Sequence, residues 1–196
     1  MSPKAFSEDE KAMVRNKLIE TAKGYLATTG IKKTTVEELS RAAGISKGAF
    51  YLFYDSKELL FLDALESIQS KIHDTLINEV KQHKNKRDCF VQVTKRMFID
   101  LRPILYVLSN DEYEILLRRV PQERIKQHIE MDDMASKHFL EQINGNKVNP
   151  DLLSAALRML MLGMLHQNEV GSHAEEAFDY LLEAVADKIF SEEKND

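Results

Sequence analysis

Residues 30–60 read GIKKTTVEELSRAAGISKGAFYLFYDSKELL, and this stretch decides the fold of the N-terminal part of the chain. Thr35 and Glu38 have the spacing of a capping box, in which each side chain satisfies a free backbone amide at the start of a helix. Gly44 can adopt the left-handed conformation that ends this helix and turns the chain. Ser46 can then cap a second helix. The stretch therefore predicts a helix-turn-helix, a motif whose second helix lies in the DNA major groove.

The second helix is predicted to run from Lys47 to Tyr54, and its first residues have the chemistry to read bases. Lys47 can donate to guanine, and the methyl group of Ala49 can touch a thymine methyl. Gly48 is unfavourable inside a helix, so a close approach of the backbone to DNA is a reason for its presence. The alternative is that Lys47 is an exposed lysine on a helix that only packs.

The composition is that of an ordinary globular protein, with 196 residues, 43% hydrophobic and 30% charged side chains. The single cysteine, Cys89, excludes a disulfide framework within the chain, and no apolar run is long enough for a membrane span. We therefore expect a cytoplasmic location and no membrane partner. The net charge of −5 is unevenly distributed, because residues 1–60 carry ten Lys and Arg against eight Asp and Glu. This uneven distribution of charge would direct the N-terminal part toward DNA.

Apolar residues recur at helical spacing along the whole chain, and we find no strand pattern. The expected helices cover residues 8–29, 36–43, 47–54, 57–83, 88–102, 111–119, 121–145, 150–167 and 173–190. Pro103 is expected to end or kink the fifth of these, because proline lacks an amide donor. The fold class is therefore all-α, with a three-helix DNA-binding domain over residues 1–55 and a larger helical domain over residues 56–196.

The run that starts at Thr35 fits the pattern T-V-x-x-(I/L)-x-x-x-A-G-(V/I)-S-x-G-x-(L/F)-Y-x-x-(F/Y)-x-x-K-x-x-L. This pattern resembles the DNA-binding domain of the TetR family of bacterial repressors. The resemblance covers about Val14 to Leu65, and the rest of the chain is similar to the family in length and helical content only. It implies a dimeric repressor that binds a palindromic double-stranded DNA operator and is released by a small-molecule effector. In such a protein, residues 56–196 would be the ligand-binding and dimerisation domain.

The candidate DNA-binding residues come from the helix-turn-helix and the start of the next helix. They are Thr35, Ser46, Lys47, Gly48, Ala49, Tyr51, Leu52, Tyr54 and Lys57. Thr35, Tyr51 and Lys57 are similar to positions that hold DNA phosphates in the family, and their hydroxyl and ammonium groups suit that role. Phe53 stands where many family members have a phosphate-binding histidine. The Tyr54 hydroxyl either replaces that contact or is buried.

The middle of the chain is rich in methionine and aromatic residues, which form either an effector pocket or a filled core. The resemblance to the family favours a pocket. Its candidate lining residues are Met97, Phe98, Leu101, Tyr106, Met131, Met134, Met161 and Met164.

The last two predicted helices have wide apolar faces, which two subunits could bury together as a four-helix bundle. The candidate interface residues are Leu153, Leu157, Leu160, Leu181, Leu182 and Val185. A repressor needs such a homodimer because one reading helix recognises only a few base pairs.

No constellation of nucleophile, base and orienting acid is present, so we expect neither enzyme activity nor a cofactor. His166, Glu169 and His173 are too few for a metal site, and no metal is expected. Cys89, near Lys86 and Arg87, is either an inert thiol or a redox sensor. The rival function is a helical effector-binding or protein-interaction module with a vestigial helix-turn-helix.

Overall fold

The computed structural model of the chain describes residues 6–143 and 148–190, which form helices joined by short turns. The elements are α1 (Glu8–Leu26), α2 (Gly30–Lys33), α3 (Val36–Ala43), α4 (Lys47–Phe50), α5 (Lys57–Gln82), α6 (Lys86–Val107), the π-helical turn η1 (Leu108–Glu112), α7 (Tyr113–Arg119), α8 (Gln122–Ile143), α9 (Pro150–Leu165), α10 (Gln167–Val170) and α11 (Ala174–Phe190). The described ranges contain no strand, which confirms the all-α fold class.

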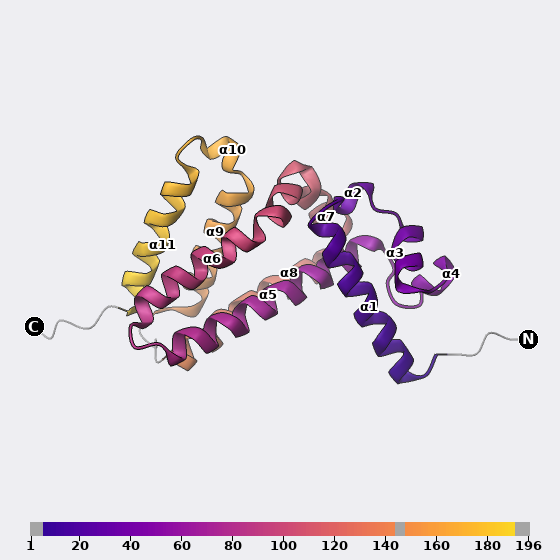
Figure 1. Cartoon of the computed structure of the whole chain (residues 1–196), viewed down its shortest axis with the longest axis horizontal. Coiled ribbons are helices and arrows are strands. Elements are labelled where there is room, and N and C mark those ends of the chain that lie inside the picture. The colour runs from indigo at the N-terminus through magenta and orange to yellow at the C-terminus, as the bar shows by residue number, and fades with distance from the viewer. Residues whose placement is uncertain (1–5, 144–147, 191–196) are drawn as a thin grey trace, which may run out of the picture.

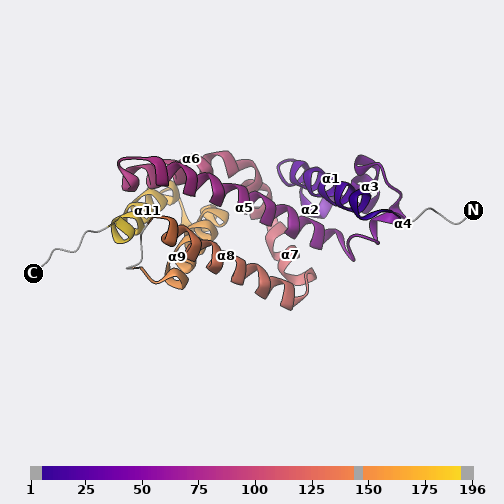
Figure 2. The same ribbon diagram turned by 90° about the horizontal axis from the view of Figure 1, so that it is seen from below.

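The molecule is elongated, with α1 to α4 at one end and α9 to α11 at the other (Figure 1). The second view shows α8 running beside α5, on the side away from α1 (Figure 2). Helix α5 packs on α1 with its first turns and on α6 and α8 with the rest, while α11 packs on α6 and α9. Fully buried side chains such as Phe50, Phe61 and Phe90 form one continuous core along this axis.

Helix α5 connects the two ends of the molecule. It has 26 residues, which corresponds to about 39 Å of helix. Ser56 caps it by accepting a hydrogen bond from the Leu59 amide at 3.2 Å. Leu60, Phe61 and Leu62 are buried around most of its circumference, because α1 and the C-terminal helices cover it from different sides. The long helix predicted from the sequence is confirmed.

Helix α6 does not end at Pro103, contrary to one of the sequence-based expectations. It continues to Val107 and widens into η1. A proline inside a helix costs about 3 kcal/mol because it removes a hydrogen bond and crowds the preceding turn. The residues beyond it, Leu105 and Leu108, are buried in the core, and this burial offsets that cost.

Other differences concern the lengths of elements. Helix α4 ends at Phe50, and residues 51–53 continue as turns, with the Phe53 amide donating to the Phe50 carbonyl at 2.9 Å. Such i to i+3 bonds tighten the last turn of many helices. The first helix ends at Leu26, and the short α2 before α3 was not expected. The predicted end of the α8 helix at Gly145 lies outside the described residues.

Candidate nucleic-acid interface and ligand cavity

Local hydrogen bonds hold the turn between α3 and α4. The Thr35 hydroxyl accepts the Glu38 amide at 3.2 Å, and the Glu38 carboxylate accepts the Thr35 amide at 2.8 Å, so the predicted capping box is present. Gly44 follows α3 with a φ of 77°, in the left-handed region. Ser46 accepts the Ala49 amide at 3.1 Å and starts α4. The geometry of a helix-turn-helix is therefore fixed by the residues that the sequence indicated.

The tip formed by α4 and the turn after it is exposed. Lys47 and Gly48 are open to solvent, Ala49 is half-buried, and the side chains of Tyr51 and Leu52 are 50% and 73% exposed. Neighbouring apolar side chains on a surface are typical of a site that contacts a partner. The neighbouring residue Phe50 is fully buried, and its side chain anchors the tip to the core.

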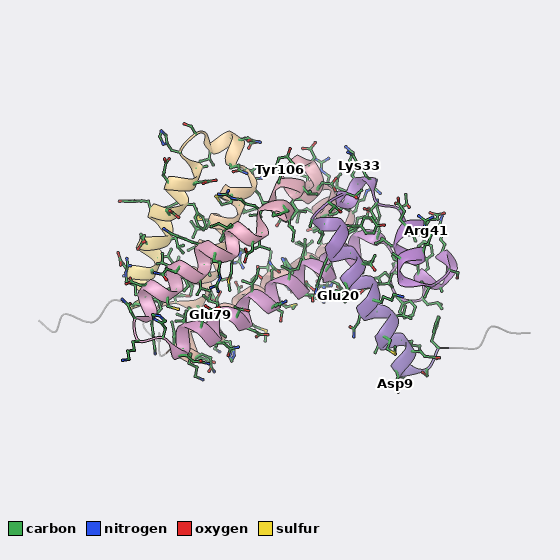
Figure 3. All side chains as sticks on the ribbon, viewed as in Figure 1. Asp9, Glu20, Lys33, Arg41, Glu79 and Tyr106 are labelled. Carbon is green, nitrogen blue, oxygen red and sulfur yellow. The ribbon has the colours of Figure 1, made fainter. Side chains whose placement is uncertain are left out.

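Cationic side chains share this end of the molecule with the tip. Lys33 and Arg41 lie there, far from α11 (Figure 3). Lys47 is held by an ion pair in which its Nζ lies 2.7 Å from Glu37 Oε1. The hydrogen bond between the two side chains raises the pKa of Lys47 and lowers the pKa of Glu37. Because both groups are in solvent, a phosphate or a base edge can replace Glu37 as the partner of Lys47 at little cost.

Tyr54 lies inside the protein rather than on the tip. Its ring is buried and its hydroxyl donates to Asp63 Oδ2 at 2.9 Å, while the guanidinium of Arg15 lies 5.0 Å from the ring centre. Burial is the main cause that raises the pKa of this phenol. Of the two possibilities for the Tyr54 hydroxyl, the structure has the buried one, and Tyr54 is not among the residues that face solvent.

Lys57 also has a role inside the domain. Its Nζ donates to the carbonyl oxygens of Ile31 and Thr34, each at 2.6 Å. These carbonyls lie at the C-terminal end of α2, where a cation satisfies acceptors that the helix leaves unpaired. Lys57 therefore connects the start of α5 to α2 in the free protein, in addition to any contact with a phosphate.

The methionine-rich region encloses a cavity of about 510 Å³ between α5, α6, α7, α8 and α9. Six of the eight predicted pocket residues line it, namely Met97, Phe98, Leu101, Met131, Met134 and Met161. Met164 is buried elsewhere, and Tyr106 is 69% exposed on the outer side of α6 (Figure 3). Tyr106 and Met164 therefore do not belong to the cavity wall, because the helix turns them away from it. A volume of this size is within the range of small-molecule sites.

A chain of charged groups connects the cavity to the N-terminal domain. Asp63, which accepts the Tyr54 hydroxyl, also accepts from Arg124 Nη2 at 3.0 Å. Arg124 Nη1 donates to Glu66 at 2.8 Å, and Glu66 faces His128 Nδ1 at 3.2 Å. Burial opposes the ionisation of Glu66, but hydrogen bonds with His128 and Arg124 outweigh it and lower the pKa of Glu66. Glu66 and His128 are part of the cavity wall.

A second connection joins η1 to α2. The buried Glu112 carboxylate accepts the Lys32 amide at 2.7 Å. Gly30 makes this approach possible, because a Cβ on it would lie 2.8 Å from Val107 and 3.0 Å from Glu112. Leu108, in the same π-helical turn, lines the cavity. Sequence reasoning missed both connections, because they join residues far apart in the chain and have no local motif.

The predicted dimer residues fall into two groups. Leu153, Leu160 and Leu182 are buried within this one chain, and Leu157 and Val185 are partly buried against its core, so they are already used in the fold. Only Leu181 is exposed. The exposed apolar side chains of α9 and α11 are instead Leu152, Met159, Leu162, Tyr180 and Leu181. The buried face and the exposed face of these helices both carry apolar residues at helical spacing, so the sequence pattern does not distinguish them. The packing of α9 on α11 and α6 shows which face is buried.

Cys89 is buried, and burial raises the pKa of its thiol, which does not favour the redox alternative. Within residues 6–143 and 148–190, no three His, Cys, Asp or Glu side chains are placed to hold a metal ion. In the same ranges, no helix is long and apolar enough to cross a membrane.

An exposed, locally capped reading helix on an all-helical body defines the chain as a protein of the helix-turn-helix class. Residues 18–64 match the family model described as bacterial regulatory proteins, tetR family. This part of the chain is therefore similar to the DNA-binding domain of TetR-family transcriptional regulators. The family and the matched relatives are regulators and not enzymes.

Two curated relatives match part of the chain. The uncharacterized HTH-type transcriptional regulator YuxN of Bacillus subtilis (strain 168) is 39% identical over 31% of this chain and 21% of its own. The probable acrEF/envCD operon repressor of Escherichia coli (strain K12) is 30% identical over 56% of this chain and 47% of its own. The match therefore spans about half the length of these relatives or less.

A solved structure matches along the whole body. FadR of Thermus thermophilus, a TetR family repressor in complex with lauroyl-CoA, superposes with a TM-score of 0.67 over 93% of this chain and 98% of its own. Its identity to this chain is 17%, so the likeness concerns the fold.

Proposed function

We propose that this protein is a transcriptional repressor that binds a palindromic operator as a homodimer and is released by a small molecule. The observation that carries the proposal is the exposed tip with Lys47 and Gly48 at the start of a capped, firmly anchored helix. A relative described as a probable operon repressor, which matches 56% of the chain, supports repression over activation. In this proposal, residues 1–55 bind DNA and residues 56–196 bind the effector and the second subunit.

The proposed DNA contacts follow the exposure of the side chains. Lys47 and Ala49 read base edges, and the uncovered backbone at Gly48 allows a close approach. Thr35 and Tyr51 position the protein on phosphates, at the N-terminal end of α3 and in the turn after α4. Ser46 and Leu52 complete the surface. Lys57 acts mainly by holding α2, and Tyr54 is left out because its hydroxyl is bonded to Asp63.

The proposed dimer uses the outer faces of α9 and α11. Leu152 and Met159 lie seven residues apart, on one face of α9, and Tyr180 and Leu181 are exposed on α11. A two-fold axis through this surface makes it contact its own copy. It would place the two reading helices of the dimer at the far ends, as two operator half-sites require.

Effector release is proposed to act through the two connections between the cavity and the DNA-binding part. A ligand that moves Glu66 or Leu108 would disturb the Asp63–Arg124 contact or the turn that holds Lys32. Packed helices shift as units, so α5 would carry the reading helix with it and change the spacing in the dimer. The ligand must have different affinities for the two spacings, because equal affinity shifts nothing.

Fluorescence anisotropy with the DNA upstream of the coding region tests the proposal. A repressor binds this DNA tightly and with a steep dependence on salt. It binds random DNA of equal length much more weakly. Equal, weak binding to both would favour the rival function, an effector-binding or interaction module with a vestigial helix-turn-helix.

A further inference from the structure

The wall of the cavity is apolar over most of its surface. Leucine, isoleucine, methionine and phenylalanine side chains from α5, α6, α8 and α9 surround it. A ligand that fills it must therefore have an apolar body. The ionisable side chains in the wall decide which polar group that body can carry.

Two carboxylates of the wall, Glu66 and Asp132, differ in how well they are compensated. Glu66 forms a two-pronged ion pair with Arg124 and faces His128. Such a bidentate pair satisfies both oxygens of a carboxylate. A ligand would find little left to bind at Glu66.

Asp132 has a single, longer ion pair and no bidentate partner. Arg158 Nη1 lies 3.6 Å from Asp132 Oδ2, beyond hydrogen-bond distance, and donates instead to Ser154 at 2.7 Å and to Asp133 at 3.0 Å. Burial raises the pKa of the Asp132 carboxyl, with His128 and Arg158 acting in the opposite direction. Its charge is therefore incompletely satisfied, and a cation brought by a ligand could complete it.

Carboxylates outnumber guanidinium groups around the cavity wall. The cluster around the wall contains the carboxylates of Asp63, Glu66, Asp132 and Asp133 and the guanidinium groups of Arg15, Arg124 and Arg158. Four negative groups therefore face three positive ones. An anionic ligand would have to be buried against that excess, whereas a cationic one reduces it.

One further polar group is open to a ligand. Thr94 of α6 lines the cavity with its side chain 7% exposed, and its hydroxyl has no hydrogen-bond partner among the described residues. Buried hydroxyls are nearly always bonded. Thr94 is thus available to a hydroxyl, amide or ether group on the ligand body.

We propose that the cavity takes an apolar ligand with one basic nitrogen, for which Asp132 is the counter-ion. This inference rests on the proposed function, in which the cavity holds the effector. Arg158 then acts as a positioning residue, because it donates to Ser154 and Asp133 and holds Asp132 only through the longer ion pair.

The test uses three probes with the same chain and different head groups, decylamine, decanol and decanoate, measured by titration calorimetry on the full-length protein. The expected order of affinity is the ammonium first, the alcohol second and the carboxylate last. A hydrogen bond to a charged partner predicts that Asp132→Asn reduces decylamine affinity about 10- to 100-fold and leaves decanol affinity unchanged. Glu130→Gln is the control, because Glu130 is exposed on the same helix and pairs with Lys126.

Three outcomes overturn the inference: decanoate binding as tightly as decylamine, an amine preference that survives in Asp132→Asn, or no binding of any probe. Operator affinity, measured in the same samples, is a separate readout. If decylamine binds with the expected preference and leaves operator affinity unchanged, the ligand class stands and the release mechanism fails. If the operator is bound and released by decanoate alone, the repressor proposal stands and the ligand class fails.

Discussion

Lys47 sits at the start of α4 with its ammonium on Glu37, and DNA must take the place of that carboxylate. We expect Lys47→Ala to cost about 1 to 3 kcal/mol of operator affinity and to relax discrimination at one base pair. Glu37→Gln should act in the opposite direction, because it removes a competitor and a negative charge near the phosphates. Fluorescence anisotropy measures the affinity of both variants for operator and for random DNA. An equal loss of affinity for the two DNAs in Lys47→Ala would contradict base reading by Lys47.

Lys57 provides a contrast to Lys47 among the lysines. Its bonds to Ile31 and Thr34 predict that Lys57→Ala lowers the stability of the DNA-binding part. The same substitution should also weaken binding to every DNA sequence by the same factor. Thermal unfolding separates the two contributions, since Lys47→Ala removes only an exposed ion pair.

Thr94 contributes an unpaired hydroxyl to the cavity wall. Thr94→Val replaces it with a methyl group of similar size, and we expect a gain of about 1 kcal/mol in the free energy of unfolding. Urea unfolding measures this gain. A loss of stability would mean that the hydroxyl has a partner in solution, such as a water molecule in the cavity.

The α2 element depends on a glycine at its first position. Gly30 has a φ of 80°, and a side chain there would meet Val107 and Glu112. Gly30→Ala should therefore destabilise the protein by about 1 to 3 kcal/mol and loosen the contact between α2 and η1. Gly24→Ala is the matched control. Gly24 lies inside α1 with nothing within 4 Å of a new Cβ, so the substitution should stabilise by up to about 1 kcal/mol.

At the scale of the whole molecule, we expect the coupling between ligand binding in the cavity and operator binding to depend on Arg124. It bridges Asp63, next to the DNA-binding part, and Glu66, in the cavity wall. Coupling between two sites is typically worth about 1 to 3 kcal/mol, or about 5- to 150-fold in affinity. Arg124→Gln should reduce this factor toward one while leaving operator affinity without ligand within a few-fold. Arg118→Gln, which removes an exposed pair with Glu114, should retain the coupling. Titration of a bound operator with ligand measures both.

Assembly can be tested on the outer face of α9 and α11. Leu181→Glu introduces a charge into the proposed interface and should give a monomer in light scattering at micromolar concentration. Ile99→Glu changes another exposed apolar residue, on α6, and should leave the dimer intact. A wild-type monomer, or a Leu181→Glu dimer, would refute the proposed interface.

The sequence alone determined the helix-turn-helix, because its signals are local. The capping box at Thr35, the left-handed Gly44 and the cap at Ser46 each act within a few residues, and all are present in the structure. The length of α5 was determined in the same way, by a cap at Ser56 and a repeat of apolar residues. Local hydrogen bonds and backbone sterics need no distant partner.

Only the tertiary structure decided which face of each helix is used. Leu182 and Leu181 are neighbours in sequence, yet one is in the core and the other in solvent. Pro103 remains inside α6 because the residues after it are buried, and Tyr54 turns inward because Asp63 accepts its hydroxyl. Burial and long-range pairing depend on elements far apart in the chain, and a periodic pattern contains no information about which of them will meet.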